Sequence, residues 1–262
     1  MKKICIFLFS GTGMTKYVID RMKKEFEGRQ VIADVFLIEK SIAEDFSYEE
    51  YDAIGVAYPV HSFNAPEIVV KFARRLPRAD NMSAFIISSA GGDSSLNFDS
   101  SKLLKKTLEK KGFSVFYDRQ FIMPSNFIVK DSGAEVKEKI NKVNIEAPAA
   151  VDEIINRVPH KMKSKFNSKI IAFLGRIEWY GIKYWRFFYA DGNCDGCGLC
   201  AGKCPNGRIV IEENRAVFKK KCGLCMRCLY LCPKKAIKTR RLFKSFGFEN
   251  WYEDLPHESA GK

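Results

Sequence analysis

Short apolar runs alternate with longer amphipathic stretches along the first part of the chain. The first run is ICIFLF at residues 4–9, and a Ser/Gly/Thr loop follows it. After that loop, Tyr17, Val18, Met22 and Phe26 recur at the spacing of one helical face. An uninterrupted apolar run is typical of a strand buried on both faces, and this recurrence is typical of an amphipathic helix. The pattern therefore predicts a strand, a loop and a helix in succession.

The strand signal recurs four more times before residue 124. It falls at 30–38, 51–60, 83–90 and 113–123, and helical spacing is found over 103–112 and 134–157. A further helix follows the third strand, with Asn64 as its cap and Pro66 in its first turn. Alternating strands and helices predict an α/β fold with a doubly wound, parallel, five-stranded sheet. Ligands are expected at the carboxyl ends of the first, third and fourth strands.

The loop SGTGMT at residues 10–15 stands between the first strand and its helix. It presents hydroxyl groups at Ser10, Thr12 and Thr15 beside a helix N-terminus, where backbone N–H groups and the helix dipole favour an anion. The loop has neither the Gly-Lys-Ser/Thr ending of a nucleotide P-loop nor the G-x-G-x-x-G of a dinucleotide fold. It predicts an anion site, and an ordinary capped turn is the alternative interpretation.

Cysteine is concentrated at the other end of the chain. Cys5 stands alone in the first strand, where we expect a core residue, and the other eight of the nine cysteines form two C-x2-C-x2-C-x3-C-P motifs. This spacing is typical of bacterial two-cluster iron–sulfur proteins, in which the fourth cysteine of each motif ligates the other cluster. One cluster would take Cys194, Cys197, Cys200 and Cys232, and the other would take Cys222, Cys225, Cys228 and Cys204.

Two zinc sites or a disulfide framework are the alternatives to iron–sulfur clusters. Zinc motifs favour paired C-x2-C units separated by a dozen or more residues, and disulfides need an oxidising compartment. The segment RIVIEENRAVF between the two motifs predicts a hairpin with its turn at Glu213–Asn214. A ferredoxin-like α+β unit with pseudo-twofold symmetry is the expected result.

The two halves resemble two known families. The cysteine-rich half resembles a bacterial two-cluster ferredoxin, the first half resembles a flavodoxin, and the whole chain resembles the flavodoxin–ferredoxin fusion proteins of anaerobes (the ferrodoxin family). This resemblance implies two [4Fe-4S] clusters held by the eight cysteines, and FMN held by three loops. The FMN-binding residues it implies are Ser10, Thr12, Gly13, Met14 and Thr15, then Tyr58, Pro59, Val60, His61, Phe63 and Asn64, then Ser89, Ala90, Gly91, Gly92 and Asp93. Two departures from flavodoxins are Met14, where Asn is usual, and a third loop without the Tyr that stacks on the flavin ring.

The expected domain organisation follows from these motifs. It comprises a flavodoxin-like FMN-binding domain (1–157), a basic aromatic linker (158–189), a ferredoxin domain (190–240) and a tail (241–262). The formal net charge is +13, and nearly all of it lies after residue 150. For the linker we expect an apolar side packed against both domains; a helix on an anionic membrane and a nucleic-acid patch are alternatives. The basic surplus favours an acidic redox partner protein and does not demand nucleic acid.

Composition places the chain among ordinary globular proteins. The hydrophobic fraction is 46%, no apolar run approaches the roughly 18 residues of a membrane span, and the first run is too short for a secretory signal. Reduced, clustered cysteines fit the cytoplasm. The predicted function is electron transfer between the clusters and FMN. The alternatives are a flavin-dependent reductase of a small molecule, in which His61 donates a proton or hydrogen bond, and a cluster-stabilised binding module.

Overall fold

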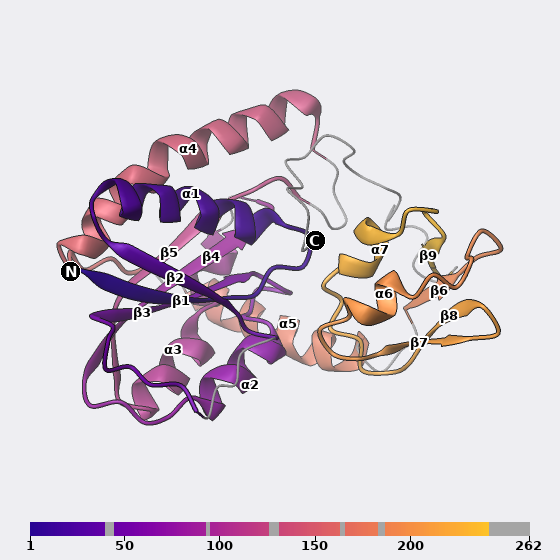
Figure 1. Ribbon diagram of the computed structural model, residues 1–262, viewed down its shortest axis with the longest axis horizontal. Coiled ribbons are helices and arrows are strands. Elements are labelled where there is room, and N and C mark those ends of the chain that lie inside the picture. The colour runs from indigo at the N-terminus through magenta and orange to yellow at the C-terminus, as the bar shows by residue number, and fades with distance from the viewer. Residues whose placement is uncertain (40–44, 93–94, 126–130, 163–165, 183–186, 241–262) are drawn as a thin grey trace.

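The sheet of the first half has five parallel strands. The computed structural model describes residues 1–39, 45–92, 95–125, 131–162, 166–182 and 187–240. The strands are β1 (Lys3–Leu8), β2 (Ile32–Leu37), β3 (Ala53–Pro59), β4 (Met82–Ala90) and β5 (Phe113–Ile122), and they pair in the order β2-β1-β3-β4-β5 (Figure 1). This is the flavodoxin-like order, in which a ligand binds where the strand order reverses, here beyond the carboxyl ends of β1 and β3. The predicted fold class is confirmed.

Helices cover both faces of this sheet. The helices α1 (Met14–Gly28) and α4 (Gly133–Ile155) lie on one face, and α2 (Glu67–Arg75) and α3 (Lys102–Lys110) lie on the other (Figure 1). Side chains of β1 alternate between two hydrophobic clusters: Ile4, Ile6 and Leu8 pack with α1 and α4, whereas Cys5 and Phe7 pack with α2 and α3. Strands buried on both faces explain the uninterrupted apolar runs. Cys5 is a core residue, as expected.

One predicted helix cap is wrong. The helix α2 begins at Glu67 with Pro66 as its cap residue, and Asn64 does not cap it. The Asn64 side-chain amide donates instead to the carbonyl oxygens of Ser62 and Ala172, both at 2.8 Å. The amide thus holds the loop after β3 to the helix that contains Ala172, 108 positions further along the chain.

That later helix, α5 (Phe166–Ile182), reverses the expected distribution of its side chains. Small or polar residues face the sheet domain: the Ser168 hydroxyl donates to Asp99, and a Cβ on Gly175 would lie 2.5 Å from the Ser62 carbonyl oxygen. The large apolar residues Ile170, Phe173, Leu174 and Ile177 are 44 to 61% exposed instead. Close backbone approach, which requires small side chains, therefore determines the docked face. Within the described residues, no helix is both long and apolar enough to cross a membrane.

The cysteine-rich half is built from two antiparallel ribbons and two short helices. The strand β6 (Phe188–Ala190) pairs with β9 (Ile237–Thr239), and β7 (Ile209–Glu212) pairs with β8 (Arg215–Phe218). The helices α6 (Leu199–Gly202) and α7 (Arg227–Leu231) begin inside the two cysteine motifs. At the β7–β8 turn, Glu213 and Asn214 have φ values of 47° and 54°, the left-handed pair that a two-residue hairpin requires. The predicted hairpin is confirmed.

Gly55 of β3 lies opposite Phe85 of β4, and the Phe85 ring covers it. A Cβ at position 55 would lie 2.4 Å from the Phe85 Cζ atom, and the ring is fully buried. We therefore expect Gly55→Val to lower the free energy of unfolding by about 2 kcal/mol through overpacking. The matched control is Gly28→Ala, which has no atom within 4 Å and should leave stability equal or slightly higher. Urea unfolding of both variants measures the effect; equal midpoints would contradict it.

Candidate cofactor sites

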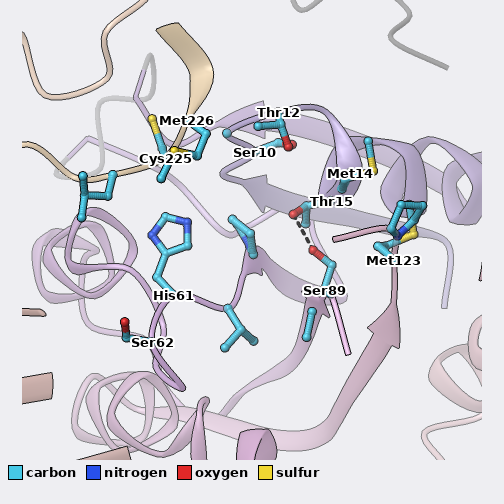
Figure 2. Close-up of a pocket in the computed structure, with 17 residues that line it drawn as sticks. Ser10, Thr12, Met14, Thr15, His61, Ser62, Ser89, Met123, Cys225 and Met226 are labelled. Atoms are coloured by element: carbon cyan, nitrogen blue, oxygen red, sulfur yellow. Dashed lines mark hydrogen bonds between the residues drawn. The ribbon is translucent and has the colours of Figure 1, made fainter. Parts of the chain in front are cut away.

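A cavity of about 90 Å³ lies at the carboxyl edge of the sheet (Figure 2). Three loops of the sheet domain, the end of β5 and one segment of the cysteine-rich half line it. The lining residues are Ser10, Gly11, Thr12, Met14, Thr15, Pro59, Val60, His61, Ser62, Ser89, Ala90, Gly91, Met123, Pro124, Leu224, Cys225 and Met226. Ten of the predicted FMN-binding residues therefore share one cavity. Gly13, Tyr58, Phe63, Asn64 and Gly92 are not among its lining residues, and Asp93 lies outside the described residues.

The Tyr58 side chain points away from the cavity, for a clear physical reason. Its side chain is fully buried in the hydrophobic cluster beneath α2 and α3, and this burial raises its pKa well above the ordinary value. Side chains alternate along a strand, so the direction of Tyr58 is fixed by Val56 on the same face. Only the positions after it, Pro59 and Val60, reach the cavity wall.

The first loop is held without a side-chain cap from its own N-cap residue. Gly13 occupies that position with φ 99°, a left-handed conformation natural to glycine. The Lys16 N–H points back to the Ser10 hydroxyl oxygen at 3.3 Å. The Thr15 and Ser89 hydroxyls lie 2.8 Å apart and join the first loop to the third (Figure 2). The result is a cluster of hydroxyl and amide groups at the start of α1.

The second loop turns sharply at His61. His61 and Asn64 exchange two backbone hydrogen bonds of 2.9 Å, and the two residues between them have positive φ. The His61 ring faces the cavity (Figure 2), and burial lowers its pKa to about 4. The imidazole is therefore neutral near pH 7. It can donate or accept a hydrogen bond, but it is not protonated as a general acid would be.

The third loop is fixed by α4. The Lys139 ammonium group donates to the Gly91 carbonyl oxygen at 2.8 Å and to Asp131 at 2.6 Å. A Cβ on Gly91 would lie 2.9 Å from the Ser125 side chain, so glycine is needed for this approach. Lys139 therefore binds the backbone of the third loop without lining the cavity itself. Neither lysine nor arginine is among the described residues that line it.

The structure brings cysteines of the two motifs close together. Cys200 lies within electrostatic reach of Cys194, Cys197 and Cys232, and a second hollow is lined by these four residues. Cys222 likewise lies within electrostatic reach of Cys225 and Cys204. Cys228 neighbours all three of the latter group and is also near Cys200. Burial raises the pKa of the Cys222 thiol to about 12, and the pKa values of Cys200, Cys225 and Cys228 are also raised by burial.

The two motifs have the same local geometry. The sulfur of Cys204 accepts a hydrogen bond from the Arg208 N–H, and the sulfur of Cys232 accepts one from the Ala236 N–H, both at 3.3 Å. N–H groups directed at sulfur are typical of iron–sulfur ligands. No three His, Cys, Asp or Glu side chains of the described residues could hold a single metal ion. In a [4Fe-4S] cluster each thiolate binds its own iron atom, so cluster ligation does not require such a group.

The second motif contacts the first loop of the sheet domain directly. A Cβ on Gly11 would lie 2.1 Å from the Cys225 carbonyl oxygen, so only glycine permits this approach. The Arg227 guanidinium donates from Nη2 to the Ser10 carbonyl oxygen and to Glu39 Oε1, both at 2.6 Å. It also lies 5.9 Å from the centroid of the Phe9 ring. The Arg227 and Glu39 side chains are 12 and 10% exposed, so the ion pair is nearly buried.

Sequence reasoning missed several residues of the cavity. Met123 and Pro124 follow β5, and their place at the carboxyl edge of a strand was the available signal. Gly11 and Ser62 stand inside loops that were correctly located. Leu224 and Met226 come from the other half of the chain, and the three predicted loops gave no indication of them.

Comparisons with known proteins give partial matches. No family model matches the chain. A 60-residue stretch is 42% identical to the DNA-directed RNA polymerase subunit Rpo3 of Methanosarcina acetivorans and covers 21% of this chain and 23% of that protein. A 48-residue stretch is 42% identical to one component of the ion-translocating oxidoreductase complex of the same organism and covers 18% of each. The chain thus spans less than a quarter of these curated relatives, and their activities do not carry over to it.

Solved structures similar to the sheet domain are remote. Flavodoxin 2 of Bacillus cereus is 18% identical, covers 59% of this chain and 99% of its own, and has a TM-score of 0.43. The flavodoxin of Megasphaera elsdenii is 18% identical, covers 57% of this chain and 98% of its own, and has a TM-score of 0.39. The rubredoxin oxygen:oxidoreductase of Desulfovibrio gigas is 16% identical, covers 59% of this chain and 37% of its own, and has a TM-score of 0.40. The fold assignment rests on the strand order, not on these scores.

His61 makes the stability of the protein depend on pH. Its pKa is about 4 in the folded chain and about 6.5 when unfolded, so as pH falls through this window the unfolded chain binds the proton first. Stability is therefore lost as pH falls from about 6.5 toward 4. We expect His61→Gln to remove about 1 kcal/mol of the loss seen between about pH 7.5 and 5.5, allowing for partial exposure. Urea unfolding at the two pH values measures this; an unchanged pH dependence would refute it.

Proposed function

We propose that the protein is an electron-transfer flavo-iron–sulfur protein that passes electrons between two [4Fe-4S] clusters and FMN. One observation carries this proposal: Cys225, a predicted cluster ligand, lines the same cavity as the three predicted flavin loops. When bound, the clusters would supply single electrons and FMN would accept one or two. The chain's task is to hold these groups close together and to shield them from water.

The groups that line the cavity match the two parts of FMN in chemical kind. Ser10, Thr12 and Thr15 offer hydroxyls beside the start of α1, as a phosphate site without a cation requires. The remaining wall is largely apolar, with Met14, Val60 and Met123 among its members, which suits a flavin ring. No Phe, Tyr or Trp is among the described residues that line the cavity, in keeping with the missing Tyr of the third loop.

The cysteine sets fit two [4Fe-4S] clusters. Cys194, Cys197, Cys200 and Cys232 would hold the first, and Cys222, Cys225, Cys228 and Cys204 would hold the second. Thiolate donors with N–H groups directed at their sulfurs are what such clusters need. The hollow of the first set shares no lining residue with the flavin cavity, whereas the second set contributes Cys225 to it. This difference supports the second cluster as the one that exchanges electrons with the flavin.

A flavin-dependent reductase of a small molecule is the second candidate. His61 beside the cavity favours it, because a neutral imidazole can hydrogen-bond a substrate over a flavin ring. A proton-donating role for His61 is disfavoured by its pKa of about 4. The redox name of one partial relative, part of an ion-translocating oxidoreductase complex, is in keeping with either candidate. The proposal includes an acidic partner protein, since most of the +13 charge lies in the cysteine-rich half. It also includes a cytoplasmic location, where clustered cysteines remain reduced.

The crossed ligation has a direct test. Protein purified without oxygen should contain about eight iron atoms and eight sulfides per chain, together with FMN. Because Cys204 belongs to the second set, Cys204→Ala should damage the second cluster, and the matched variant Cys232→Ala should damage the first. Iron analysis and electron paramagnetic resonance of the reduced protein separate the two. Loss of the same cluster in both variants would refute the crossing, and zinc in place of iron would refute the clusters.

The proximity of the second motif to the flavin loop predicts how electron transfer responds to the interface. Glu39→Gln keeps the shape of the side chain but removes its charge from Arg227, so we expect the interface to loosen by about 2 kcal/mol. Dithionite-driven flavin reduction should then slow several-fold, whereas the iron content should not change. Glu50→Gln is the matched control, because Glu50 pairs with Lys3 at an exposed site distant from the cavity. Stopped-flow absorbance measures the rates, and equal rates in both variants would contradict the proposal.

A further inference from the structure

The two cysteine motifs are repeats related by an offset of 28 positions, and they differ where they face the sheet domain. Cys194, Cys197 and Cys200 correspond to Cys222, Cys225 and Cys228. Between the cysteines, the first motif has Gly196 and Gly198, where the second has Leu224 and Met226. The backbone has positive φ at both pairs of positions, but only the first motif has glycine there.

The backbone at these four positions is left-handed. Gly196 and Gly198 have φ values of 69° and 77°, and Leu224 and Met226 have φ values of 45° and 61°. Glycine adopts this conformation freely, whereas a Cβ makes it unfavourable for leucine and methionine. Strained backbone of this kind is often found where a side chain has a function. The second motif therefore keeps an unfavourable conformation that glycine would relieve, as it does in the first motif.

The side chains of Leu224 and Met226 line the cavity assigned to the flavin. Leu224 and Met226 are both 3% exposed and both line the cavity, on either side of Cys225. Figure 2 shows Cys225 and Met226 on the side of the cavity opposite Ser89. Leu224 and Met226 also belong to the hydrophobic cluster of the cysteine-rich half. Packing of that half does not in itself require large side chains there, because the first motif has glycine at both corresponding positions.

We infer that Leu224 and Met226 are flavin-binding residues that form an apolar wall of the FMN site, supplied by the cluster-binding half of the chain. This inference rests on the proposed function, since it assigns the cavity to FMN. The two side chains exclude water from the side of the cavity that the three loops leave open. Binding of the flavin and docking of the cysteine-rich half then stabilise each other, because the wall exists only in the docked arrangement.

The test converts the second motif into the pattern of the first. The variant Leu224→Gly/Met226→Gly should keep both clusters, because the first motif binds its cluster with glycine at these positions. Its affinity for FMN should fall about tenfold, from the lost apolar contact. Fluorescence titration of FMN into flavin-depleted protein measures the dissociation constant, and iron content verifies the fold.

A matched single substitution separates flavin contact from loss of stability. Leu224→Ala and Leu229→Ala remove the same side chain from the same hydrophobic cluster at 3 and 5% exposure, but only Leu224 lines the cavity. Both should lower the melting temperature, and only Leu224→Ala should weaken FMN binding. Wild-type affinity in the glycine variant, or equal losses in the two alanine variants, would overturn the inference while leaving the proposed function in place. Failure of the wild-type protein to bind FMN would overturn both.

Discussion

The carbonyl oxygen of Cys225 lies against the α-carbon of Gly11, and the architecture of the cavity depends on this contact. Any side chain at position 11 would separate the two halves of the protein at this point, and the cavity would lose one wall. Arg227, two residues further along, binds the Ser10 carbonyl oxygen and Glu39. A backbone approach and a nearly buried ion pair thus fix the second cysteine motif at the edge of the sheet, where the strand order reverses.

Much of the fold could be predicted from the sequence because its causes are local. Strands buried on both faces have uninterrupted apolar runs, and β1 has one because its side chains alternate between two hydrophobic clusters. The hairpin turn at Glu213–Asn214 followed from Asn214, which tolerates positive φ, and from the strand pattern on either side. The cysteine spacing predicts two ligand sets, because each motif repeats the same spacing over eleven residues.

The parts that could not be predicted depend on contacts between distant segments. Ser10 and Arg227 are 217 positions apart, and no local pattern pairs them. Asn64 has the sequence features of a helix cap, but a helix arriving 108 positions later takes its amide. Tyr58 was assigned to the flavin although strand alternation points it into the core. One signal was available: Leu224 and Met226 stand where the first motif has glycine, Arg227 stands where it has Leu199, and all three face the sheet domain.

The continuity of the chain stabilises the contact between the two halves. Two separate proteins that form a stable complex usually bury about 800 Å² on each partner, since association costs translational and rotational freedom. Within one chain that cost is largely removed, and the effective concentration of one half near the other is of millimolar order. One glycine, one ion pair and two apolar side chains can then determine the docked arrangement. The helix α5 restricts it further, because Gly175 and the Asn64 amide fix the connecting segment against the second loop. The connecting segment and the second cysteine motif are thus both anchored to loops of the sheet domain. The second motif lines the cavity as a result, whereas no residue of the first motif is among the described residues that line it.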